Sequence, residues 1–119
     1  MKSNTLRLGN LLTYNNDLLR VNMLGYGANP YNINCDILEK NIINFDTDKI
    51  SPIPLTEEWL LKFGFKKSVI FFMKESMNIE FIENGCLFSL DGEYEVFIEH
   101  IHQLQNLYFA LTNSELIIN

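Results

Sequence analysis

The stretch from Pro54 to Phe65, PLTEEWLLKFGF, constrains the fold most strongly because it encodes a short helix with both ends marked. Thr56 is placed as the N-cap, where its hydroxyl accepts a hydrogen bond from a free amide of the first turn. Two glutamates follow it and put negative charge near the positive end of the helix dipole. Gly64 suits the left-handed position after the helix. We therefore predict a helix over residues 56–63, carrying the only tryptophan, Trp59.

The length and composition favour one globular domain over residues 1–119. A chain of this size, with 47% hydrophobic residues, can build a core without metal or disulfide support. Cys35 and Cys86 belong to no metal-binding or redox motif, so we expect buried thiols. The first residues lack the apolar segment of a secretory signal, and no apolar run is long enough to cross a membrane. We therefore expect a cytoplasmic protein.

The N-terminal third alternates strand-like segments with turns. Residues 6–14 and 18–24 are apolar and flank an Asn-Asn-Asp turn, which predicts an antiparallel hairpin. The segment 25–32 contains two glycines and a proline and is the most loop-like part of the chain. We expect one further strand within residues 36–44.

After the Trp59 helix, Phe65-Lys66-Lys67 starts a predicted four-stranded β-meander, in which residues 69–73 form a strand. Asn84-Gly85 is a strong signal for a two-residue hairpin turn, and it would pair Phe81 with Phe88. A three-residue turn at 90–92 then pairs Phe88 with Tyr94. This register keeps the apolar core residues of the meander on one face. The residues expected on this core face are Ile79, Phe81, Phe88 and Leu90.

The last element is a helix over residues 102–111, with Leu104, Leu107, Tyr108 and Leu111 on one stripe. The fold expected from these elements is of the α+β class. It is a twisted antiparallel sheet, formed by the N-terminal hairpin and the C-terminal meander, with two short helices.

Four residues are the candidates for a ligand-binding site. Tyr26 and Tyr31 lie in the glycine-rich loop and could stack on a base or on a side chain of a partner. Arg20 and Lys66 belong to the few cations of the chain and could contact a phosphate. The alternative is that the tyrosines belong to an ordinary surface loop and that the cations only keep the protein soluble.

An apolar patch on the other face of the meander is a second candidate for binding. Ile82, Leu87 and Phe97 would lie there beside the carboxylates of Glu93, Glu95 and Glu99. Phe109 lies off the stripe of the last helix and could make another contact.

Catalysis has little support in the sequence. The only histidines, His100 and His102, stand in a His-x-His pattern next to Glu99, but no third metal ligand is implied by the spacing. A helix N-cap or a surface pair is the alternative. We therefore expect no enzyme activity and no cofactor. The net charge of −6 argues against binding to a nucleic acid polymer.

Three motifs resemble an uncharacterised family of short proteins from gut bacteria and their phages: LRLGN at 6–10, PLTEEWLLKFGF at 54–65 and HQLQNLYFALT at 102–112. The resemblance implies a phage or mobile-element setting and carries no catalytic residue to this chain. In that setting we expect an anti-defence binding protein, homo-oligomeric, that sequesters a small nucleotide immune signal. The alternative is a protein-interaction module that inhibits a host protein. A small metal-dependent enzyme is the least favoured function.

Overall fold

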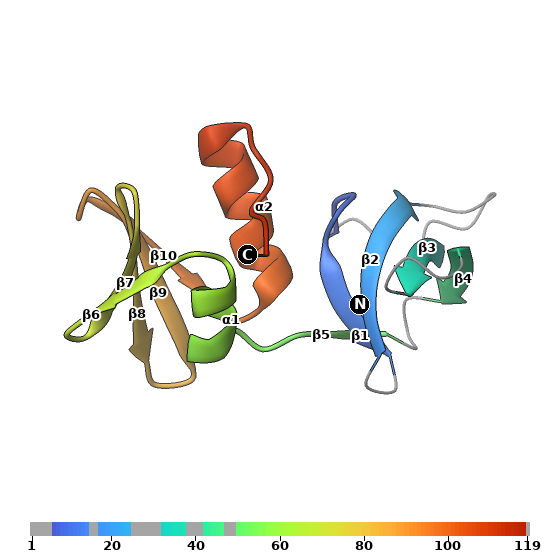
Figure 1. Ribbon diagram of the computed structural model, residues 1–119, viewed down its shortest axis with the longest axis horizontal. Helices are drawn as coiled ribbons and strands as arrows, with labels where there is room; N and C mark the ends of the chain where they lie inside the picture. Colours follow the sequence, from blue (N-terminus) through green and yellow to red (C-terminus); the bar gives the residue numbers. More distant parts are fainter. Residues whose placement is uncertain (1–5, 15–16, 25–31, 38–41, 47–49, 119) are drawn as a thin grey trace.

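The computed structural model describes residues 6–14, 17–24, 32–37, 42–46 and 50–118. Its strands form two antiparallel five-stranded sheets that lie on either side of the C-terminal helix (Figure 1). The first sheet has the strand order β4-β3-β2-β1-β5. Its strands are β1 (Leu11–Tyr14), β2 (Asp17–Leu24), β3 (Asn32–Ile37), β4 (Ile42–Asp46) and β5 (Ser51–Pro52).

The second sheet is a meander with the strand order β10-β9-β8-β7-β6, so that β10 and β6 form its edges. The two helices of the described residues are α1 (Glu57–Lys62), before this sheet, and α2 (Ile101–Thr112), after it. The strands of this sheet are β6 (Lys66–Ser68), β7 (Phe71–Lys74), β8 (Met77–Ile82), β9 (Gly85–Leu90) and β10 (Tyr94–Ile98).

The α+β class with antiparallel strands and two short helices is confirmed, but the strands divide differently from the prediction. The hairpin and the meander form separate sheets rather than one. The meander has a fifth strand because Val69 adopts a positive φ of 49°, which turns the chain between β6 and β7. Instead of the single strand expected within residues 36–44, the structure has two strands, β3 and β4. Each of them overlaps one end of this range.

Helix α1 forms as its end signals predict. Thr56 accepts a hydrogen bond from the Trp59 amide at 3.4 Å. At the other end Gly64 has a φ of 89°, and the amide of Phe65 donates to the carbonyl of Leu60 at 3.0 Å. This pattern is a Schellman cap, which uses two of the free carbonyls at the end of the helix. The helix packs Leu60 and Phe63 into the core.

The predicted registers of the meander are each wrong by two residues. Ile79 pairs with Phe88 rather than with Leu90, and Phe88 pairs with Val96 rather than with Tyr94. A shift of two residues leaves every side chain on the predicted face, because side chains alternate along a strand. Ile79 and Phe88 are accordingly buried on the inner face.

The main core lies between the inner face of the second sheet, the two helices and the hairpin. Leu11 of β1 belongs to the same buried cluster as Phe63 of α1 and Leu104 of α2, so this core includes residues of both sheets. Cys86 is buried in it with a free thiol, as expected, and burial raises its pKa to about 11. A smaller core on the opposite face of the hairpin contains Leu6, Leu12, Leu19, Val21 and Ile50.

Polar contacts attach α2 to the N-terminal segment. Gln105 accepts a hydrogen bond from the Leu11 amide at 2.8 Å and donates to the Gly9 carbonyl at 3.1 Å. Asn106 accepts from the side-chain amide of Asn10 at 2.8 Å. Asn10 and Gln105 are both buried. Buried amides need such partners, so these bonds fix how the hairpin sits against α2. In the described part of the chain, neither helix is long and apolar enough to cross a membrane.

Candidate binding sites

The outer face of the second sheet exposes a group of apolar side chains. Strand alternation places them on the side away from the core, and the ladder aligns Phe71, Glu80, Leu87 and Phe97 in one row across four strands. Leu87 is half-buried. We call this side of the sheet the outer face; besides Leu87, its exposed apolar residues are Phe71 (38%), Met73 (41%), Ile82 (39%) and Phe97 (46%). The expected patch of Ile82, Leu87 and Phe97 is part of it.

Gly85 shapes this surface. A Cβ atom at residue 85 would lie 2.5 Å from the ring of Phe97, closer than real side-chain contacts allow. The ring therefore lies over the bare backbone of the neighbouring strand. The turn that precedes Gly85 uses the positive φ of Asn84, 67°, whereas Gly85 itself begins β9 and pairs with Ile82. The glycine that signalled a turn in the sequence is needed here for packing.

The negative charge of the protein is concentrated in the segment that contains β8, β9, β10 and the turns between them. Residues 77–99 contain six acidic residues and no lysine or arginine. The rest of the chain has nine acidic residues (15 − 6) and nine basic ones, so this segment carries the whole net charge of −6. Glu80 and Glu95 lie on the outer face by their register. Among the described residues, no ion pair involves an acidic side chain of this segment.

The structure separates the two cations predicted to bind one ligand. Arg20 is exposed on β2 of the first sheet and lines a pocket of about 420 Å³. Lys66 is exposed on β6 of the second sheet and lines a different, open pocket of about 340 Å³, together with Gly64 and Met73. Each of these pockets thus contains only one of the two cations. Tyr26 and Tyr31 lie outside the described residues.

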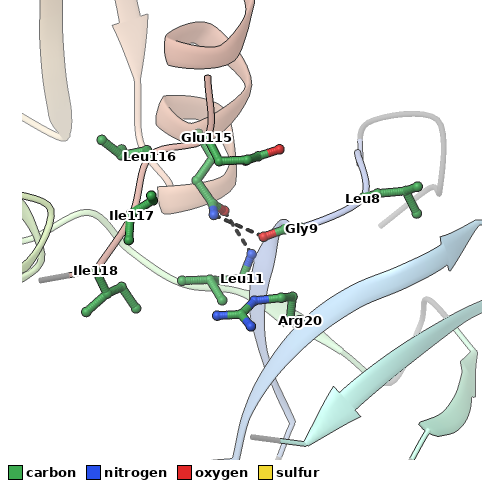
Figure 2. A pocket seen from close by; sticks show the side chains of 9 residues that line it. Leu8, Gly9, Leu11, Arg20, Glu115, Leu116, Ile117 and Ile118 are labelled. Carbon is green, nitrogen blue, oxygen red and sulfur yellow. Dashed lines mark hydrogen bonds between the residues drawn. The ribbon is translucent and has the colours of Figure 1, made fainter. Parts of the chain in front are cut away.

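The pocket at Arg20 is formed between the hairpin and the segment after α2 (Figure 2). Figure 2 shows the Arg20 guanidinium directed toward the side where Leu11 and Ile118 lie. The lining is mainly aliphatic. Its residues are Leu8, Gly9, Leu11, Arg20, Gln105, Glu115, Leu116, Ile117 and Ile118.

The two histidines take part in the start of α2. His100 is the N-cap residue, and the side chain of Gln103 accepts a hydrogen bond from its amide at 2.9 Å. His102 is buried within the helix, and its ring stacks on His100 with 5.8 Å between the ring centres. Burial, together with the nearby His100, lowers the pKa of His102 to about 4. Among the described residues, no three His, Cys, Asp or Glu side chains are grouped to hold a metal ion.

Phe109 is covered rather than free. The guanidinium of Arg7 lies 4.4 Å from the centre of its ring and also binds Glu115 through both terminal nitrogens. Part of this ring is therefore used inside the molecule. The additional contact expected from the sequence at Phe109 is therefore partly covered by Arg7.

No known protein family, curated protein or solved structure matches this chain. The function has to be inferred from the residues and the surfaces described above. The concentration of charge in residues 77–99 was not among the features predicted from the sequence, although the charge of each successive segment reveals it.

Proposed function

We propose that this protein is a non-catalytic binding module that recognises a basic, partly apolar surface of another protein through its outer face. The observation that carries this proposal is the half-exposure of Phe71, Met73, Ile82 and Phe97 on one sheet face, next to carboxylates without counter-charges in the described chain. Contiguous apolar patches on small proteins often mark interaction sites. Aromatic residues and methionine are the types that such interfaces favour.

The charge distribution indicates what kind of partner fits. A segment that carries the whole net charge of −6 attracts basic surfaces and repels acidic ones. Two copies meeting through this face would double the negative charge in one interface, so self-association is better served by other surfaces. Homo-oligomer formation stays a prediction. We infer that the partner presents lysine or arginine side chains around an apolar centre.

The resemblance to short proteins of gut bacteria and their phages suggests a setting for this activity. A phage or mobile-element protein that binds a host protein would act by covering a working surface of that host protein. A basic surface of the host, such as one used to bind an anionic substrate, fits the outer face in both charge and apolar character. We therefore propose an anti-defence role as an inhibitor of a host protein.

Sequestration of a nucleotide signal is the second candidate, and Arg20 in its pocket is the observation that favours it. The described lining of this pocket is aliphatic rather than aromatic, and stacking would depend on Tyr26 and Tyr31. Lys66 lies in the other sheet and would not reach the same ligand. For these reasons we favour binding to a protein over sequestration of a nucleotide.

Affinity capture from host lysate with matched variants tests the proposed function. Phe97→Asp places a charge on the outer face, at the edge strand β10. Leu61→Asp places the same charge on α1, where Leu61 is equally exposed. A captured protein that is retained by Leu61→Asp, lost by Phe97→Asp and released by salt supports the proposal. A host protein captured equally well by both variants, or a protein that is acidic at the contact, would overturn it.

A further inference from the structure

The pocket at Arg20 has the construction of a small-ligand site, independent of the outer face. Its volume of about 420 Å³ is in the range of ligand pockets, which are mostly apolar with a few polar groups that fix the orientation. Leu8 and Leu11 lie on the side of the N-terminal segment, and Leu116, Ile117 and Ile118 come from the segment after α2 (Figure 2). Of these three, Ile117 and Ile118 are exposed to solvent.

The other polar groups of the described lining are already used by the protein. Gln105 bonds to the Leu11 amide and to the Gly9 carbonyl. The Glu115 carboxylate accepts hydrogen bonds from both terminal nitrogens of Arg7. Arg7 also bonds to Asn106 and stacks on Phe109, so its guanidinium is committed to holding the fold together.

Arg20 differs from Arg7 in this respect. Within the described residues it forms no ion pair or hydrogen bond through its side chain, and it is exposed at the pocket. Its neighbour across the β1–β2 ladder is the buried Leu11, so a cationic and an apolar residue stand side by side at the pocket. A guanidinium binds a carboxylate or a phosphate with two parallel hydrogen bonds.

We propose that this pocket binds a small amphipathic anion, an alkyl carboxylate whose head group pairs with Arg20 and whose chain lies against the aliphatic walls. The apolar chain supplies most of the affinity and Arg20 selects the negative head group. An apolar tail also contacts the residues after α2, so binding should hold this segment in place. Nucleotides share the anionic head but present a polar, aromatic body, which the described walls suit less well.

Isothermal titration with a chain-length series tests the proposal. Butyrate, hexanoate, octanoate and decanoate are titrated below their micelle concentrations, with decylamine and cyclic and linear nucleotides as comparisons. Each added CH₂ should tighten binding by about three- to fourfold, because the walls remove it from water. Decylamine should not bind. Equal affinity along the series, or binding of nucleotides but not of decanoate, would overturn the proposal.

Three variants locate the site. Arg20→Met keeps the length of the side chain and removes the charge, so it should weaken decanoate by at least about tenfold. Ile118→Asn should weaken decanoate through the apolar wall, and Phe97→Asp should leave its affinity unchanged. A decanoate affinity that Phe97→Asp abolishes would assign the ligand to the outer face instead.

An arginine at residue 20 could instead serve to stabilise the first sheet, because its register partner on β3 is Asp36. If Arg20 only stabilises the first sheet, Arg20→Met lowers the melting temperature of the ligand-free protein and leaves decanoate binding unchanged. That result would overturn the proposal. If it serves the pocket, the variant melts like the wild type and loses the decanoate-dependent rise in melting temperature.

Discussion

The ring of Phe97 lies so close to Gly85 that a Cβ atom on residue 85 would come within 2.5 Å of it. Gly85 has no positive φ, so backbone strain does not explain the glycine. The close approach does, since it lets the aromatic ring lie over the backbone of β9. The shape of the outer face between β9 and β10 thus depends on this two-residue contact.

Gly85→Ala should displace Phe97 and lower stability by about 1–2 kcal/mol, because an added methyl in a filled space forces its neighbours to move. Thermal or denaturant unfolding measures the change. The double variant with Phe97→Ala is the control, because without the ring the new methyl keeps only a tight approach to the backbone carbonyl of Ile98, at 3.1 Å. The alanine should then cost clearly less in the Phe97→Ala background. An equal cost in both backgrounds would contradict the contact.

His102 should make the protein less stable in acid. Its folded-state pKa is lowered to about 4, from an ordinary value of 6.5, first by burial and then by His100. The unfolded chain therefore binds a proton between pH 6.5 and 4 that the folded protein does not bind. The stability contribution is fully present above pH 6.5 and decreases as the pH falls toward 4, by about 1–3 kcal/mol in total.

Denaturant unfolding at closely spaced pH values checks this expectation. His102→Gln removes the titrating ring, so its stability should change less between pH 6.5 and 4 than that of the wild type. The buried Nδ1 atom of His102 has no hydrogen-bond partner in the described chain, which also disfavours a second proton on the ring. Identical pH profiles for the wild type and His102→Gln would contradict the assignment.

Arg7→Met should cost more than the loss of an ordinary surface ion pair. The guanidinium joins Glu115, Asn106 and Phe109, and only 26% of its side chain is exposed. We expect a loss of about 1–2 kcal/mol in urea unfolding, since several charge-assisted bonds disappear together. Lys62→Met is the matched control, because it removes an exposed i,i+4 pair with Glu58 and a cation–π contact with Trp59 at 4.8 Å, which together are worth about 1 kcal/mol or less. Equal losses of stability for the two variants would show that the Arg7 contacts contribute no more than those of an exposed surface lysine.

The helices were predictable because their signals are local. Thr56 and Gly64 mark α1 within one stretch of sequence, and Asn113 ends α2 with a left-handed φ of 58°. The faces of the meander strands were predictable for a related reason. Alternation fixes the face on which each residue lies, whatever the exact pairing. It does not fix burial, since Phe81 lies on the expected core face but is 39% exposed.

The registers and the division into two sheets were not accessible in the same way. A shift of two residues leaves the buried face unchanged, so hydrophobic alternation cannot distinguish the predicted pairing of Phe88 from the observed one. Whether Arg20 and Lys66 lie in the same part of the molecule depends on which sheet each of their strands joins. That choice is made by long-range packing, which short sequence patterns do not encode.

The most direct test of the proposed function is the dissociation constant of the captured host protein for the wild type and for two outer-face variants. Phe97→Asp should weaken binding by at least about tenfold, as expected when an aromatic contact of an interface is replaced by a charge. Glu80→Gln with Glu95→Gln should weaken it less and reduce its salt dependence, since these carboxylates attract basic residues. Affinities unchanged by all three substitutions would contradict a binding site on the outer face.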